Sequence, residues 1–108
     1  MKKIFFFAAF LVASLVFSQE KKTVYEKSGN LVKVTYYNEA GKISVQGFFK
    51  NKKLTGKWVS FDNKGKKKQI AYYNKGKKVG KWIIFEKNVL KEINYDDNTI
   101  VSVYNRKS

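Results

Sequence analysis

The sequence predicts an all-β protein, an antiparallel β-hairpin meander of about three 24-residue units and seven or eight strands. Three observations lead to this prediction. The chain repeats at an offset of 24 residues, short runs rich in aromatic and β-branched residues recur, and Asn, Gly and Lys separate these runs. After the N-terminal segment no stretch has the 3.6-residue apolar period of a helix. Parallel strands would need crossover segments, for which the spacing leaves no room.

The first residues have the features of a secretory signal. Residues 1–3 form a basic start, and residues 4–17 are apolar apart from one serine. A membrane span needs roughly 20 apolar residues, so this run is too short, and Ser18 offers a cleavage position. We therefore expect residues 1–18 to be a signal peptide and the mature chain to have no transmembrane span. The expected location is the periplasm, the cell surface or the medium. An uncleaved anchor and a buried N-terminal element are the alternatives.

The remaining chain divides by its repeats. Residues 19–24 are expected to be a lead-in, residues 25–96 the repeats, and residues 97–108 a cap strand with a tail, which open-ended arrays need for solubility. The strongest internal match is Gly56-Lys57-Trp58, which recurs as Gly80-Lys81-Trp82. Three positions recur in the same register: Tyr25, Phe49 and Tyr73; Tyr37, Phe61 and Phe85; and Val34, Trp58 and Trp82.

The third unit has a shorter turn after Phe85 than the second unit has after Phe61. We interpret this as a slip of one residue. Ile93 and Tyr95 are then expected to take the places of Ile70 and Tyr72.

Each unit is expected to contain two strands and two turns. Residues 69–73 and 81–85 read as strands of one such unit. Asn63-Lys64-Gly65 and Asn74-Lys75-Gly76 read as turns, because Asn and Gly tolerate positive φ. Asp96-Asp97-Asn98 also reads as a β-turn, since the Gly and terminal Glu of a calcium loop are missing.

The repeat resembles a known family. An aromatic pair, a Lys-rich turn, Gly-Lys-Trp and a short strand ending in Phe are similar to the bacterial variant of the MORN repeat. The stretches that carry this resemblance are Phe48-Phe49 to Phe61 and Tyr72-Tyr73 to Phe85. Proteins of this type are often labelled antitoxin-like, and the resemblance implies a β-hairpin array used for binding. The first unit departs from the pattern, with Val32-Lys33-Val34 in place of Gly-Lys-Trp.

The composition excludes many functions. The chain has no His and no Cys, which excludes disulfides, thiolate zinc sites, a nucleophilic thiol and the Ser-His-Asp triad. The segment 76–81 has the wrong glycine spacing for a phosphate loop. The carboxylates fall mostly in expected turns and form no candidate catalytic pair. We expect no enzyme activity, no cofactor and no metal.

Trp58 and Trp82 lie one repeat apart and should stack side by side. The structural interpretation is a ladder of large side chains that packs neighbouring hairpins. The functional interpretation is an aromatic platform for a ring or a sugar face. Strand alternation places Val59 and Phe61 on the face opposite Trp58. Aromatic residues on both faces imply that one face is covered by curling, by a partner or by self-association.

The lysines should gather at the two ends of the strands, because alternate turns of a meander share one end. Lys50, Lys52 and Lys53 are expected beside Lys75, Lys77 and Lys78, with Lys64, Lys66, Lys67 and Lys68 at the opposite end. One interpretation is solvated turns that prevent edge pairing; the other is a strip that binds polyanions. The candidate binding residues are Lys57, Trp58, Lys81, Trp82, Lys52, Lys53, Lys77 and Lys78.

The formal net charge of +15 points to an anionic partner. Because export is expected, the leading hypothesis is a non-catalytic module that binds an acidic protein or an anionic component of the cell envelope. Nucleic acid is not expected as the partner of an exported protein. The alternatives are a polyanion-binding module, for lipid headgroups or for nucleic acid if the protein is not exported, and an antitoxin-like inhibitor of a partner protein.

Overall fold

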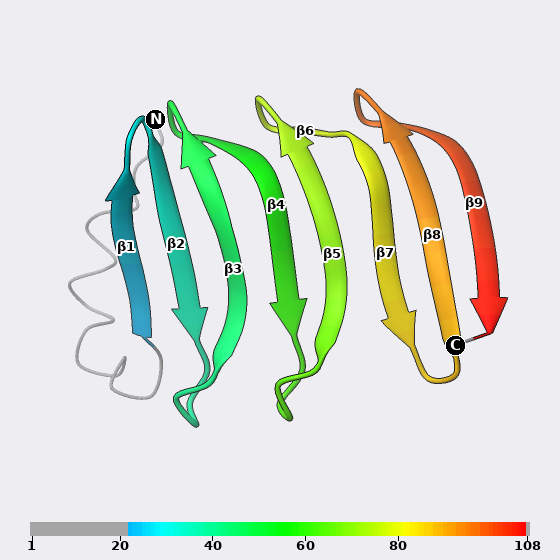
Figure 1. Cartoon of the computed structure of the whole chain (residues 1–108), viewed down its shortest axis with the longest axis horizontal. Helices are drawn as coiled ribbons and strands as arrows, with labels where there is room; N and C mark the ends of the chain where they lie inside the picture. Colours follow the sequence, from blue (N-terminus) through cyan, green and yellow to red (C-terminus); the bar gives the residue numbers. More distant parts are fainter. Residues whose placement is uncertain (1–21, 108) are drawn as a thin grey trace, which may run out of the picture.

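The computed structural model describes residues 22–107, which form one open antiparallel sheet (Figure 1). Its strands are β1 (Lys22–Ser28), β2 (Leu31–Tyr37), β3 (Ile43–Lys50), β4 (Lys53–Phe61), β5 (Lys67–Asn74), β6 (Lys77–Lys78), β7 (Gly80–Glu86), β8 (Val89–Asp96) and β9 (Thr99–Lys107). Each strand pairs with the next along the chain, except that β6 and β7 both pair with β5. The predicted all-β meander is confirmed. The count is nine because an irregularity divides one strand into β6 and β7.

The N-terminal part of the described chain already belongs to the sheet. The expected signal peptide, residues 1–18, lies outside the described residues. β1 begins at Lys22, so residues 22–24 belong to the first strand and not to a lead-in, and they pair with β2. Over residues 22–107 no helix is long and apolar enough to cross a membrane.

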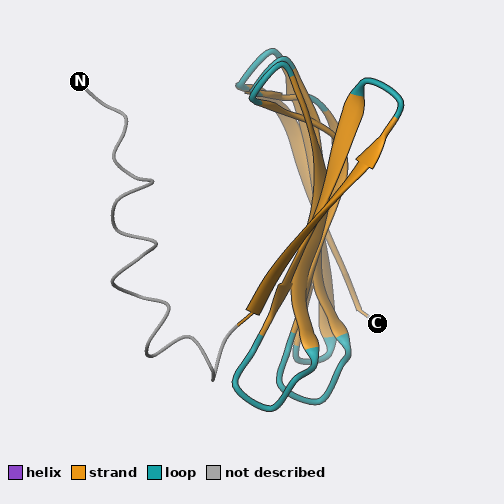
Figure 2. Ribbon diagram, turned by 90° about the vertical axis from the view of Figure 1, so that its left-hand side faces the viewer, coloured by secondary structure: helices purple, strands orange, loops and turns teal. Residues whose placement is uncertain are grey.

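The sheet is a single twisted layer, which Figure 2 shows from the side. The right-handed twist of each strand accumulates across the sheet. Its core consists of side chains on one face that pack against one another: Val34, Trp58, Ala71 and Trp82 are buried there. We call this side of the sheet the tryptophan face. Partly buried hydrophobic residues surround the core, namely Tyr36, Val45, Phe49, Leu54, Tyr73, Ile93 and Tyr95.

The turns lie at two rims of the sheet. The upper rim, drawn at the top of Figure 1, holds the turns at 29–30, 51–52, 75–76 and 97–98, and the lower rim holds those at 38–42, 62–66 and 87–88. At the upper rim both central residues have positive φ in three turns: 52° and 67° in Asn51-Lys52, 52° and 82° in Lys75-Gly76, and 53° and 72° in Asp97-Asn98. These are type I′ turns, whose twist matches that of the flanking strands.

Two lower-rim turns share one design, 24 residues apart. The side-chain oxygen of Asn38 accepts hydrogen bonds from the backbone N–H of Ala40 at 2.9 Å and of Lys42 at 3.0 Å. Asp62 does the same for the N–H groups of Lys64 and Lys66, at 2.8 and 2.9 Å. Such Asx turns let a short side chain replace a backbone partner.

The third lower-rim turn is shorter, and it corrects the expected alignment of the last unit. Glu86 pairs with Val89 across a two-residue turn. Trp82 consequently pairs with Ile93 as Trp58 pairs with Ala71. Gly80 pairs with Tyr95 as Gly56 pairs with Tyr73. The slip is therefore two residues and not one, and Tyr95 takes the place of Tyr73.

Candidate functional site

The repeated Gly-Lys-Trp motif forms a bulge in the sheet. Between β3 and β4 the pairing passes from Gln46 with Val59 to Phe48 with Thr55, so residues 56–58 lie opposite one residue of β3. The corresponding irregularity separates β6 from β7. Gly56 and Gly80 have φ of 69° and 73° at these two places. Glycine is favoured there because this left-handed region is strained for residues with a Cβ.

The bulge allows each indole to lie over the neighbouring strand. Trp58 Nε1 donates a hydrogen bond to the carbonyl oxygen of Phe48 at 3.1 Å, and Trp82 Nε1 donates to that of Tyr72 at 3.0 Å. Trp58 is 9% exposed and Trp82 is 5% exposed. The two indoles are therefore part of the core, and the aromatic platform considered from the sequence is not presented to solvent.

Five aromatic rings form a ladder along the tryptophan face. The centroid distances are 5.2 Å for Phe49–Trp58, 6.3 Å for Trp58–Tyr73, 5.3 Å for Tyr73–Trp82 and 4.9 Å for Trp82–Tyr95. Three of the four contacts are edge-to-face, an arrangement that the ring quadrupoles favour. Burial raises the pKa of Tyr73 within the ladder. Each Trp thus joins the aromatic residue of its own unit to that of the next.

Lys78, one of the candidate binding residues, takes part in this ladder. Its Nζ lies 5.2 Å from the ring centroids of both Trp82 and Tyr95. A cation over an aromatic face is attracted by the ring electrons. Lys78 therefore covers the end of the ladder as well as contributing charge to the upper rim.

The other upper-rim lysines belong to two turns that lie against each other. The N–H of Gly76 donates to the carbonyl oxygen of Leu54 at 2.9 Å, which holds the β5–β6 turn beside β4. A groove of about 390 Å³ lies between these turns. It is lined by Lys50, Asn51, Lys53, Thr55, Asn74 and Lys75. Three ammonium groups and no carboxylate line it, so its charge suits an anion.

Lys57 and Lys81 lie away from the groove and differ in their surroundings. Both pair across strands on the face opposite the tryptophans, Lys57 with Tyr72 and Lys81 with Asn94. Lys81 Nζ lies 3.8 Å from Glu92, whose other oxygen is 3.0 Å from Arg106. The positive charge of Lys81 is therefore partly compensated by the carboxylate of Glu92.

Glu92 is a buried carboxylate that the sequence did not single out. It lies within β8 and is only 6% exposed. Its cross-strand neighbours are Ile83 and Tyr104. Lys81 and Arg106 supply the positive charge that a buried carboxylate needs. The apolar residues within 89–95 mark a strand and were the signal available in the sequence.

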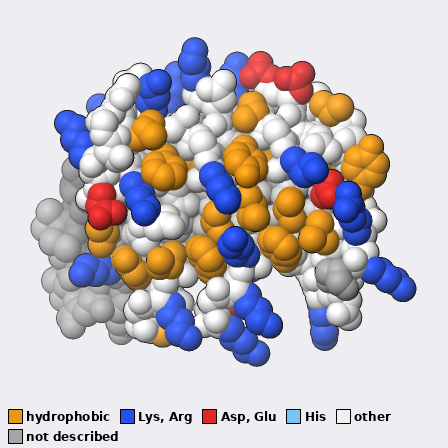
Figure 3. Space-filling view, viewed as in Figure 1, with side chains coloured by type: hydrophobic (Ala, Val, Ile, Leu, Met, Phe, Trp, Pro, Cys, Tyr) orange, Lys and Arg blue, Asp and Glu red, His pale blue; other side chains and the backbone are white. Residues whose placement is uncertain are grey.

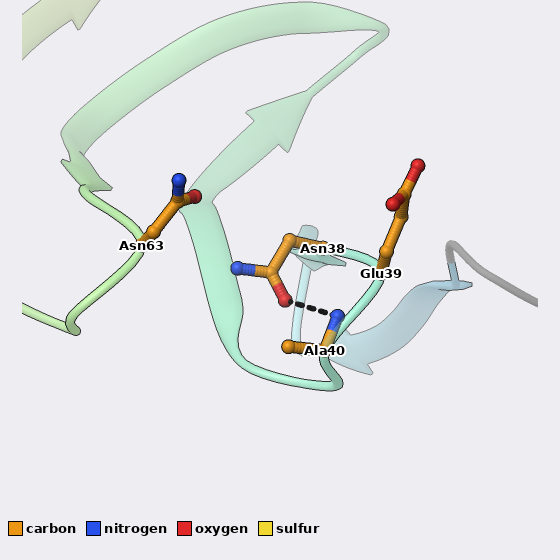
Figure 4. A pocket seen from close by; sticks show the side chains of 4 residues that line it. All are labelled: Asn38, Glu39, Ala40 and Asn63. Carbon is orange, nitrogen blue, oxygen red and sulfur yellow. Dashed lines mark hydrogen bonds between the residues drawn. The ribbon is translucent and has the colours of Figure 1, made fainter.

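The lower rim carries a second hollow, of about 380 Å³, lined by Asn38, Glu39, Ala40 and Asn63 (Figure 4). The side-chain oxygen of Asn38 points back to the N–H of Ala40, so it serves the turn. In the equivalent turn the hydrogen bond from the N–H of Lys66 lowers the pKa of Asp62. Across residues 22–107 no three acidic side chains gather as potential metal ligands. This hollow is better explained as a space between turns.

Positive charge is distributed along both rims. Figure 3 shows one face of the sheet, with Lys and Arg side chains at the upper and lower rims and also across the middle, among the hydrophobic side chains. Lys52, Lys53 and Lys77 are exposed, which solvated turns and a binding strip would both require. The structure adds Lys50 and Lys75 to them through the groove. Comparison with protein-family models, curated proteins and solved structures finds no match for the chain.

Proposed function

We propose that this chain is an exported, non-catalytic repeat protein of the MORN-like type that binds an acidic protein or an anionic component of the cell envelope. The observation that supports the proposal is the upper-rim groove, where Lys50, Lys53 and Lys75 line one hollow without an acidic residue. Adjacent turns of a repeat array supply these three side chains, so the charge is gathered by the fold and not by one local segment.

The remaining lining groups fit the same kind of ligand. Asn51, Thr55 and Asn74 bring side chains that can donate hydrogen bonds. Lysine offers a mobile point charge without the fixed fork of arginine. The groove therefore suits several negative charges along an extended chain, such as clustered carboxylates, more than one rigid anion.

Burial of the tryptophans shapes how such a partner would be bound. With Trp58 and Trp82 in the core, an interface anchored on indole rings would require the side chains packed around them to move. Contact through rim lysines needs no rearrangement. Its affinity should fall as salt rises, because counterions screen exposed charges.

A matched pair of variants tests the groove. Poly-L-glutamate serves as the probe, and binding is measured by fluorescence anisotropy. Replacing Lys50, Lys53 and Lys75 together by Gln should weaken binding at least about tenfold, by the loss of roughly 1 kcal/mol per lysine seen at anionic surfaces. The control replaces Lys64, Lys66 and Lys67 by Gln and removes the same charge from the lower rim. It should weaken binding less than about threefold if the groove is the site. Equal losses would contradict the groove.

The polyanion-binding alternative has one observation in its favour. Lys64, Lys66, Lys67 and Lys68 make the lower rim basic as well, so a long polymer could contact both rims. Counterion release would then give a steep linear fall of log K with log salt concentration. A slope shared by polyglutamate, polyphosphate and anionic vesicles would favour this alternative. Binding to one class of acidic protein, identified by crosslinking in intact cells, would favour the leading proposal.

Export has its own test. Cell fractionation should find the protein outside the cytoplasm, with residues 1–18 removed, and deletion of these residues should retain it in the cytoplasm. A full-length product in the cytoplasm of unmodified cells would contradict this part of the proposal.

A further inference from the structure

The sheet face opposite the tryptophan face carries a row of alternating basic and aromatic residues. Phe48 lies opposite Lys33, and Tyr72 lies opposite Lys57. Lys57 is part of the bulge of β4 that faces β3 beside Phe48. The β5–β7 pairing, extended by two residues, brings Tyr72 beside Lys81. The lysine–aromatic row thus crosses β2, β3, β4, β5 and β7 in the order Lys33, Phe48, Lys57, Tyr72 and Lys81.

The lysines of this row are the part of the Gly-Lys-Trp motif that all three units share. They lie 24 residues apart, although the first unit is Val32-Lys33-Val34 and lacks both Gly and Trp. The glycine serves the bulge and the tryptophan serves the core. The lysine lies on the other face and takes part in neither. Its recurrence is therefore not explained by the packing of the sheet, and it indicates a role at the surface.

The first two lysines of the row are not neutralised by contact. Lys57 is exposed and Lys33 is half-buried. Glu26 lies opposite Lys33 on the edge strand β1. The ion pairs formed within residues 22–107 have other cations, so neither Lys33 nor Lys57 lies within 4.0 Å of a carboxylate oxygen there. Both ammonium groups are available to an anionic ligand.

The third lysine has an acidic neighbour, but this neighbour has a closer partner. Lys81 Nζ lies 3.8 Å from Glu92, whereas Arg106 lies 3.0 Å from the same carboxylate group. The side chain of Lys81 is 55% exposed. Two cations share one carboxylate, so a net positive charge remains at this end of the row.

The spacing of the row indicates the kind of ligand. Neighbouring strands lie about 4.8 Å apart, so lysines on alternate strands lie about 10 Å apart. A matching ligand is linear, is negatively charged at every second unit and has a neutral ring between its charges. A pyranose ring advances an extended polysaccharide by close to one strand spacing. The negative face of an aromatic ring attracts the C–H groups of a sugar.

We propose that the lysine–aromatic row binds a linear acidic polysaccharide in which acidic and neutral sugars alternate. The carboxylates lie at the three lysines, and the neutral sugars lie over Phe48 and Tyr72. The sheet is twisted (Figure 2), so the lysines do not point to one plane and a flat bilayer cannot contact all of them. This choice of ligand rests on the export that is part of the proposed function, and it does not depend on the upper-rim groove.

Substitution of the lysines tests the row. The probes are octasaccharides of hyaluronan and of unsulfated chondroitin, in which acidic and neutral sugars alternate, and isothermal titration of the purified protein measures binding. Lys33→Gln, Lys57→Gln and Lys81→Gln together should weaken binding at least about tenfold, as expected for the loss of three exposed ion pairs. An unchanged affinity, or no binding of either probe by the unmodified protein, would overturn the proposal.

A control variant separates the row from the overall charge. Lys27, Lys42 and Lys87 are exposed and lie outside both the row and the groove. Replacing these three by Gln removes the same charge and should change the affinity less than about twofold, because distant exposed charges are screened. A loss equal to that of the row variant would overturn the proposal.

The aromatic positions have their own test. Tyr72→Leu should weaken binding about three- to tenfold through the loss of the ring, whereas Tyr72→Phe should stay within about twofold of the unmodified protein. Circular dichroism checks that both variants are folded, and Phe48→Leu repeats the test at the other ring. Octasaccharide binding that is unchanged in both folded Leu variants would overturn the proposal.

Three comparison probes distinguish other polyanions. Tighter binding of a polymannuronate octasaccharide, which carries an acid on every sugar, would show that charge density decides the affinity and would overturn the proposal. So would single-stranded DNA or phosphatidylglycerol vesicles that bind through the three lysines more tightly than the octasaccharides. Polyglutamate binding at the groove is measured separately, so failure of the row leaves the groove standing, and failure of the groove leaves the row standing.

Discussion

The indole ring of Trp58 lies directly over Gly47 of the neighbouring strand, so that a Cβ at position 47 would come within 2.0 Å of a ring atom. The φ of Gly47 is not positive, so its backbone conformation does not require glycine. A residue without a Cβ is required there because of the contact with Trp58. The relationship explains why a glycine stands in the middle of β3, where it would otherwise weaken the strand.

Gly47→Ala should therefore destabilise the protein by about 1–3 kcal/mol, the usual cost of overpacking a core. Thermal unfolding followed by circular dichroism measures the loss. Ala71 pairs with Trp58 from the other side and already carries a Cβ, so Ala71→Gly is the reciprocal control, with a smaller cost of about 0.5–1 kcal/mol from backbone entropy. An unchanged melting temperature in Gly47→Ala would mean that Trp58 can move aside.

Replacing Trp82 should affect folding before it affects binding. Trp82→Ala removes the ring between Tyr73 and Tyr95 and the hydrogen bond to the carbonyl of Tyr72. We expect a loss of about 3–5 kcal/mol in unfolding free energy, measured by urea denaturation. The triple Lys→Gln variant of the upper rim should lose binding without this loss of stability. If Trp82→Ala kept full stability and lost binding, the indole would be a binding residue after all.

Stability should fall in acid partly through Asp62. Its pKa is lowered by the hydrogen bond from the N–H of Lys66, so the folded state favours the ionised carboxylate. This contribution is complete above the unfolded pKa, near 4, and is lost as the pH falls through the lower folded value. Asp62→Asn should flatten the dependence of melting temperature on pH below about pH 4, the unfolded value. Asn38 shows that an amide can serve the same turn. A profile unchanged by the substitution would contradict this account.

Glu92 offers a test of whether its ion pairs stabilise the sheet. Glu92→Gln should cost about 1–3 kcal/mol, because Arg106 and Lys81 lose a charged partner. Glu92→Ile removes the same charge but places an apolar side chain between Ile83 and Tyr104, so it should cost less than Glu92→Gln. Urea denaturation of both variants measures these changes in unfolding free energy. A larger loss for Ile than for Gln would show that hydrogen bonds at position 92, and not apolar packing, stabilise the contact between β8 and β9.

Several local features were predictable because they depend on neighbouring residues alone. The turn at Asn74-Lys75-Gly76 followed from residues that accept positive φ, and the turn at Asp96-Asp97-Asn98 from the missing features of a calcium loop; the structure confirms both turns. The lysine-rich rims followed from the alternation of turns in a meander. The slip in the last unit was misjudged, because a two-residue turn changes the pairing of Trp82 and Gly80, and pairing is not visible in an internal alignment.

The sequence by itself determined the architecture: a 24-residue repeat with turn residues at regular intervals can form little other than a hairpin meander. The tertiary structure decided which side chains are buried and which are exposed to a partner. It folded Trp58 and Trp82 over adjacent strands, buried Glu92, and joined lysines of two turns around one groove. The physical reason is that exposure depends on cross-strand register and on bulges at Gly56 and Gly80, which bring together residues that lie far apart in the chain.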